Sequence, residues 1–153
     1  PLPRVIKHKI DVLKIANKAK LKDEPWTLGL VESIAAVDLI RKQRGFETRN
    51  RIALLLLDSN FEIGLKEYII HAQGLNLSGK SLEDIFEHRD LAISIVCQKV
   101  KLNSVTLTKI RHYYALRNKL IHERATVEVT ETDVDNYRET IEKVLNLLFG
   151  LNF

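Results

Sequence analysis

The chain has 153 residues, of which 45% are hydrophobic and 29% are charged, and its formal net charge is +4. These values are ordinary for a single soluble domain with a sizeable core. No apolar run approaches the length of a transmembrane helix and no signal-peptide pattern opens the chain, so we expect a cytoplasmic protein without a membrane segment. The single cysteine, Cys97, excludes an internal disulfide, and its apolar surroundings in residues 91–97 predict a buried structural thiol.

The positive charge is concentrated at the N-terminus. Residues 1–22 hold seven of the 24 cations and one of the 20 anions, which leaves 17 cations and 19 anions for the rest. We therefore expect residues 1–25 to form a basic helix or linker, which either follows a polyanion or connects domains, and residues 26–153 to form the folded domain. Because the sequence contains no methionine and starts at Pro1, we expect it to be a domain of a longer protein.

Apolar residues at helical spacing predict a basic amphipathic helix over 4–20, broken before Pro25, and then further helices over 27–44 and 48–73. A third segment starts at Ser81 with a capping box, and residues 88–90 divide it into two pieces. We expect Ser104 to cap the fourth helix and Thr132 the last one, with an extended loop over residues 125–129 between them. This pattern predicts an all-α, up-and-down bundle of four or five helices.

A polar line runs along the otherwise apolar second helix of that domain. Asp58, Glu62 and Lys66 recur every four residues, and Glu62 precedes Lys66 in the order that favours an ion pair within one helix. One interpretation is a solvated edge. The other is an acidic wall opposite a buried cation, and the fourth helix supplies a candidate for that cation.

Arg117 lies in the middle of the apolar arc of the helix that covers residues 107–122. A guanidinium there is costly, because its charge persists and its five donors need acceptors. Asn118 lies at the edge of the arc, and His122 lies one turn beyond Asn118. A cation, an amide and an imidazole near one helix end suit the binding of a phosphodiester; the alternative is a structural arginine that helix-end carbonyls satisfy.

The sequence narrows the chemistry that such a group of residues could perform. The five histidines show no pairing at metal-ligand spacing, and the glycines do not form a phosphate cradle, so we expect neither a metal nor a cofactor. Histidine exchanges protons near neutral pH, and arginine neutralises phosphate. In RNA the 2′-hydroxyl is itself the nucleophile, so cleavage needs only a base, an acid and a cation. Two chains related by a two-fold axis could supply two imidazoles to one phosphate.

The segment Arg117-Asn118-Lys119-Leu120-Ile121-His122 resembles the Arg-x4–6-His motif of the HEPN superfamily, and the likeness extends over residues 28–150. The resemblance implies a dimeric helical bundle with metal-independent endoribonuclease activity, found in toxin–antitoxin and antiviral defence systems. It implies that Arg117 and His122 are the catalytic pair, that Asn118 is the polar residue after the arginine, and that Asp58 or Glu62 supports the site. RNA, a second copy of the chain and a sensor or antitoxin are the partners it implies. Some members are inactive, so a non-catalytic dimerisation or RNA-binding module and a plain scaffold remain alternatives.

Overall fold

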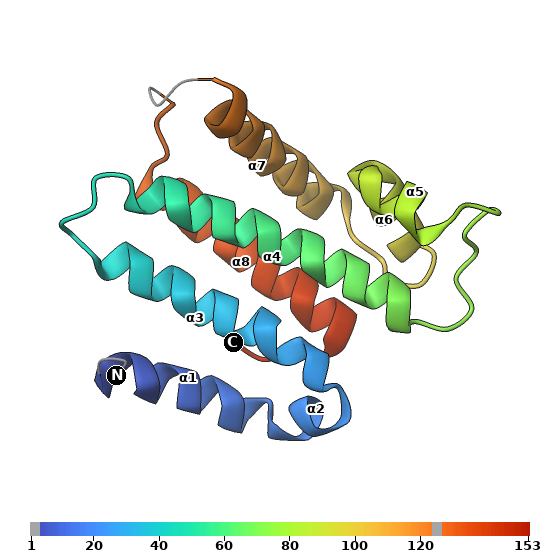
Figure 1. The fold of residues 1–153 in the computed structure, drawn as a ribbon, viewed down its shortest axis with the longest axis horizontal. Helices are drawn as coiled ribbons and strands as arrows, with labels where there is room; N and C mark the ends of the chain where they lie inside the picture. Colours follow the sequence, from blue (N-terminus) through green and yellow to red (C-terminus); the bar gives the residue numbers. More distant parts are fainter. Residues whose placement is uncertain (1–3, 124–126) are drawn as a thin grey trace.

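The computed structural model of the chain describes residues 4–123 and 127–153, and within these ranges it contains helices and no strand. The predicted all-α bundle is thus confirmed (Figure 1). The elements are, in chain order, α1 (Arg4–Ala16), α2 (Lys18–Asp23), the 3-10 helix η1 (Pro25–Thr27), α3 (Leu28–Lys42), α4 (Arg49–His71), α5 (Leu82–Glu87), α6 (Arg89–Val96), α7 (Ser104–His122) and α8 (Glu131–Phe149).

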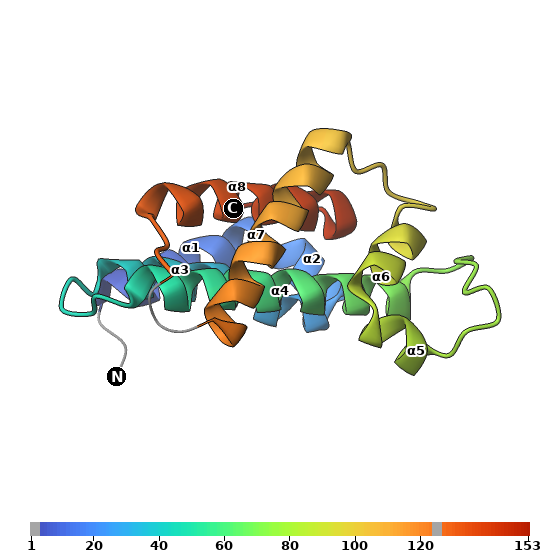
Figure 2. The ribbon, with the colours of Figure 1, turned by 90° about the horizontal axis from the view of Figure 1, so that it is seen from above.

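The central element is α4, which contacts α3, α6, α7 and α8. Its side chains Leu54, Leu57 and Phe61 are fully buried, as expected for a helix that is apolar on most of its circumference. Figure 2 shows that α7 crosses α4 at a steep angle, whereas α3 and α8 run along it. The steep crossing brings the C-terminal half of α7 to the middle of α4, where Arg117 contacts Asp58.

The basic N-terminal segment packs against α3. Lys14 pairs with Glu32 at 2.8 Å, and Lys9 pairs with the nearly buried Asp38. The helix breaks before Pro25, as predicted, and Pro25 opens the single turn of η1. These ion pairs hold α1 beside the bundle, while the division into separate units at residue 25 stays a prediction.

Asn17, between α1 and α2, joins that segment to the end of the chain. Its side-chain amide donates to the carbonyl of Asn152 and accepts from the backbone N–H of Asn152, both at 2.8 Å. Asn17 is 2% exposed, and the neighbouring Leu151 is fully buried. Residues 151–153 therefore form part of the packed structure.

Two of the predicted helix caps are wrong and one is confirmed. Ser81 and Asp84 form the expected capping box at the start of α5. The cap of α7 is Asn103 and not Ser104, because Asn103 is the extended residue whose side chain accepts the Thr106 N–H. The cap of α8 is Thr130 and not Thr132, since the acidic partner that completes its capping box is Asp133.

The third predicted segment divides at His88, as expected, and His88 is exposed. The prediction that Cys97 is buried is wrong, because this thiol is exposed. The apolar run ends with α6 at Val96, and Cys97 is the residue at which the chain leaves the helix.

Part of the predicted loop over residues 125–129 lies outside the described residues. Val127 to Thr130 form neither helix nor strand, and Val129 is buried. The carbonyl of Val129 accepts a hydrogen bond from the Asn50 amide at 3.2 Å, which ties this segment to the first turn of α4.

Candidate functional site

Asp58, on α4, is the centre of the polar cluster, and it is 1% exposed. Arg89, from the first turn of α6, binds both of its carboxylate oxygens, with Nη1–Oδ1 at 2.7 Å and Nη2–Oδ2 at 2.9 Å. The hydroxyl of Tyr137, on α8, donates to Oδ1 at 2.7 Å. Residues of three helices therefore meet at one buried carboxylate. Arg89 binds it in the bidentate geometry that makes an ion pair strong.

Arg89 is itself enclosed by the bundle. Its side chain is 7% exposed, and its guanidinium lies 4.0 Å from the ring centre of Tyr114 and 5.2 Å from that of Phe61. Burial by itself lowers the pKa of Arg89, but the hydrogen bonds and charge of Asp58 outweigh it, so the pKa is raised. Arg89 is the principal partner of Asp58, and sequence reasoning missed it.

Arg117 approaches the same carboxylate from α7. Its Nε lies 3.4 Å from Oδ2 of Asp58, and its Nη1 donates to Oδ1 of Asn118 at 3.0 Å. The structure thus brings Arg117, Asn118 and Asp58 together, as hypothesised. Unlike Arg89, Arg117 has a side chain that is 31% exposed, so its guanidinium reaches the surface of the molecule.

Glu62 lies one turn beyond Asp58 on α4. It binds Lys66 at 2.7 Å, which is the ion pair expected from the sequence, and it lies 3.5 Å from Nη2 of Arg89. Burial raises the pKa of Glu62, but the hydrogen bond from Lys66 and the charges of Lys66, Arg89 and Arg117 hold it below its ordinary value. The cluster of two carboxylates and three cations therefore carries one surplus positive charge, and Arg117 is its accessible arginine.

His122 does not join this cluster. It is the last residue of α7, it is exposed, and it has no hydrogen-bond or ion-pair partner among the described residues. Five residues along a helix correspond to a rise of about 7.5 Å and a rotation of about 140°, so the side chains of Arg117 and His122 diverge within one chain.

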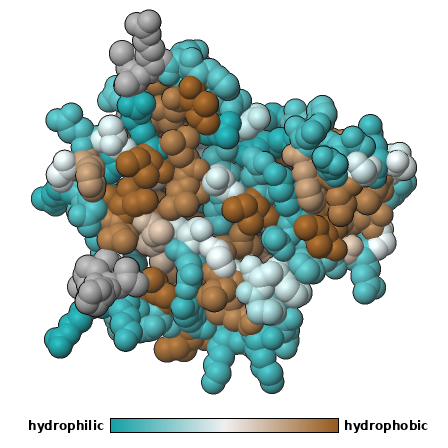
Figure 3. Space-filling view, in the orientation of Figure 1, coloured by the Kyte–Doolittle hydropathy of each residue, from teal (hydrophilic) through white to brown (hydrophobic). Residues whose placement is uncertain are grey.

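Exposed apolar side chains lie next to the cluster. Ile52, Leu55 and Ile63 of α4 are 43%, 37% and 50% exposed, and Ile121 of α7 is 50% exposed. On the helical wheel of α4 the first three follow directly after Asp58 and Glu62, on the side that faces solvent. Figure 3 shows the resulting apolar surface over the N-terminal half of α4 and the adjoining end of α7.

No protein-family model, curated protein or solved structure matches the chain. Membership of the HEPN superfamily therefore stays a prediction from the motif. Among residues 4–123 and 127–153, no group of three or more His, Cys, Asp or Glu side chains could hold a metal ion. No helix in the same ranges is long and apolar enough to cross a membrane.

Proposed function

We propose that this chain is a metal-independent endoribonuclease domain that cleaves RNA as a homodimer, with Arg117 and His122 as its catalytic residues. The observation that carries the proposal is the way in which Arg117 is held and exposed. It contacts a carboxylate whose charge Arg89 already neutralises, and it keeps part of its guanidinium at the surface. An arginine held in this way has both spare charge and spare donors for a phosphate.

The proposed reaction needs no group beyond those of the protein and the RNA. One His122 removes the proton of a 2′-hydroxyl, and the 2′-oxygen attacks the adjacent phosphorus. The bond to the 5′-oxygen breaks, and a second His122 donates a proton to that leaving oxygen. Arg117 stabilises the charge on the phosphoryl oxygens. The products are a 2′,3′-cyclic phosphate and a 5′-hydroxyl.

The remaining residues of the cluster act as positioning residues in this proposal. Asp58 is too deeply buried to touch a substrate, and it fixes the Nε side of Arg117 while Arg89 and Tyr137 fix Asp58. Asn118 accepts from Nη1 of Arg117 and so orients the guanidinium plane. Glu62 balances Lys66 and Arg89 at the edge of the cluster.

A second copy of the chain is the partner that completes the site. His122 does not join the Arg117 cluster within one chain, and exposed apolar side chains of α4 and of the end of α7 lie on the same two helices as the cluster. In a two-fold pairing through this surface, each α7 faces its counterpart, so two imidazoles and two guanidiniums line one cleft. The context suggested by the motif is a toxin–antitoxin or antiviral system, in which a sensor or antitoxin domain controls the activity.

Cleavage is tested by incubating total RNA and EDTA with the wild type, with His122→Ala, and with His8→Ala as a matched control that removes another exposed histidine. We expect the wild type and His8→Ala to produce cyclic phosphate ends and His122→Ala to produce none, with unchanged circular dichroism. Equal cleavage by His122→Ala would refute the mechanism.

The pairing is tested with Leu55→Glu against Leu147→Glu, a substitution of a similarly exposed leucine on α8. Sedimentation should show a dimer for the wild type and Leu147→Glu, and a monomer without nuclease activity for Leu55→Glu. A wild type that sediments as a monomer at all concentrations would refute the composite site.

The second candidate is a non-catalytic RNA-binding and dimerisation module. It is favoured by the isolation of His122 from the Asp58 cluster. In that case the wild type and His122→Ala bind RNA equally and leave it intact, while Arg117→Ala weakens RNA binding or dimerisation.

A further inference from the structure

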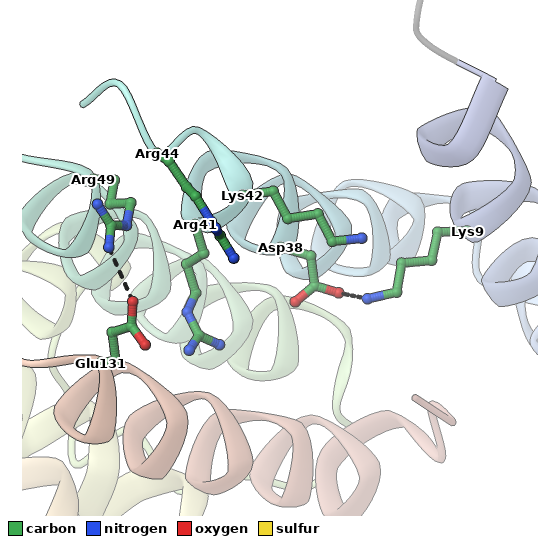
Figure 4. A pocket seen from close by; sticks show the side chains of 7 residues that line it. All are labelled: Lys9, Asp38, Arg41, Lys42, Arg44, Arg49 and Glu131. Carbon is green, nitrogen blue, oxygen red and sulfur yellow. Dashed lines mark hydrogen bonds and ion pairs between the residues drawn. The ribbon is translucent and has the colours of Figure 1, made fainter. Parts of the chain in front are cut away.

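A second group of cations lines a cavity of about 300 Å³ that is open to solvent, between the end of α3 and the loop after it, the first turns of α4 and α8, and the middle of α1. Five basic side chains and two carboxylates line it, and Figure 4 shows them around one space, on these helices and on the loop after α3. The sequence does not indicate this grouping, because the residues are separated along the chain and are assembled by the packing of α1 on α3.

The positive charge of the cavity exceeds what its carboxylates compensate. Asp38 is bound by Lys9 and by Arg138, which lies outside the cavity lining. Glu131 is bound by Arg49 at 3.0 Å, and Arg41 is bound by Asp135, also outside the lining, at 2.6 Å. Lys42 and Arg44 have no ion-pair partner among the described residues. The close-up in Figure 4 shows both side chains directed toward the space between Arg41 and Lys9.

Several donors at the cavity also lack acceptors. The Nε atoms of Arg41 and Arg49 are buried and make no hydrogen bond within the described residues. Arginine does not lose its proton in proteins, so a buried guanidinium N–H without an acceptor is costly. Burial, together with the nearby Arg138, also lowers the pKa of Lys9. An anion in the cavity would offset the positive charge around Lys9, Arg41 and Arg49.

The cavity is separate from the Arg117 cluster. Arg49 precedes Asp58 by nine residues on α4, which corresponds to a rise of about 13 Å and a rotation of about 180°. The two sites therefore lie on opposite sides of α4, and an anion bound at Arg49 is not the phosphate that Arg117 contacts.

We propose that this cavity binds the diphosphate group of a small anion, either inorganic diphosphate or a nucleoside diphosphate. Arginines recognise phosphate oxygens through paired N–H donors, and here they surround the space from several sides. A volume of about 300 Å³ corresponds to about ten water molecules of the liquid, which is more room than one phosphate group needs. Because Asp135, outside the lining, pairs with Arg41 at 2.6 Å, two positive charges remain in excess, and this excess matches a diphosphate better than a singly charged ion. The inference does not depend on the nuclease proposal.

The test is calorimetric titration of the full chain with inorganic phosphate, inorganic diphosphate and ADP at low salt. The test variant is Lys42→Ala with Arg44→Ala, which leaves the ion pairs of Asp38 and Glu131 intact. The control is Lys99→Ala with Lys101→Ala, which removes two exposed cations from the segment between α6 and α7. We expect diphosphate to bind more tightly than phosphate, and the test variant to weaken diphosphate binding by about tenfold or more while the control matches the wild type.

The comparison of ADP with inorganic diphosphate distinguishes a nucleotide ligand from inorganic diphosphate. Tighter binding of ADP than of diphosphate identifies a nucleotide as the ligand, and equal binding identifies the phosphate groups alone; both results support the pocket. The absence of diphosphate binding to the wild type, or an equal loss in the test and control variants, would overturn the proposal.

Discussion

Replacement of Arg89 by methionine tests how much of the stability of the bundle depends on the ion pair with Asp58. Methionine fills part of the same space beside Tyr114 and Phe61, but it removes the guanidinium that contacts both rings and both of its hydrogen bonds to the carboxylate. Asp58 then keeps the Tyr137 hydroxyl and the longer contact with Arg117. A nearly fully buried negative charge would be left without its main compensating partner.

Removing one partner of a buried ion pair costs about 3–5 kcal/mol, and for a chain of this size that corresponds to a fall of about 6–20 °C in the melting temperature. The triple variant Arg89→Met, Asp58→Leu and Tyr137→Phe removes the buried charges and the hydroxyl together. It should therefore lose less stability than Arg89→Met alone, because no buried polar group is left unpaired by the change.

Urea unfolding of the wild type, Arg89→Met and the triple variant, followed by circular dichroism, measures these differences. The reasoning would be refuted by a loss below about 1 kcal/mol in Arg89→Met, which is the range of an exposed ion pair. It would also be refuted by a triple variant whose loss equals the sum of the three single losses, because a shared ion pair requires strong coupling.

Three further changes test local features. Thr130→Ala should destabilise the protein by about 1 kcal/mol through loss of the α8 cap, while Thr132→Ala should change the unfolding free energy by less than about 0.5 kcal/mol. Gly150→Ala should cost about 1 kcal/mol in the same urea assay, because residue 150 has φ +67° at the end of α8. Burial, together with the charge of Asp58 and its hydrogen bond, raises the pKa of Tyr137 well above 10, so unfolded chains lose this proton first and stability falls as the pH rises above about 10. Tyr137→Phe should reduce this alkaline loss, measured as unfolding free energy at pH 9 and pH 11; an unchanged slope would contradict the assignment.

The helices could be predicted from the sequence because their apolar residues keep helical spacing. The end of α7 at His122 and the division of the third segment at His88 follow from this pattern. The caps of α7 and α8 could not be chosen reliably, since Asn103 and Thr130 compete with nearby residues of similar capping ability. Which of them takes the extended conformation depends on the path of the preceding loop.

The sequence indicated that Arg117 would face an acidic residue, because a charge within an apolar helix face needs a partner of opposite charge on the neighbouring helix. Arg89 could not be predicted in this way, because residues 88–90 interrupt the apolar pattern and so resemble a break in a helix and not the start of one. The orientation of His122 could not be predicted, because spacing fixes its place on α7 but not what lies across from it. The basic cavity depends on tertiary packing alone.

The reciprocal hydrogen bonds of Asn17 with Asn152 have a consequence for how the molecule opens. The two residues are 135 positions apart, yet neither the α1–α2 junction nor the C-terminal segment can leave the bundle without breaking the hydrogen bonds between them. Hydrogen exchange should therefore show the α1–α2 junction and the C-terminal residues opening as one cooperative unit. Deleting residues 151–153 should speed amide exchange at the α1–α2 junction, although the deletion removes residues only at the other end of the chain.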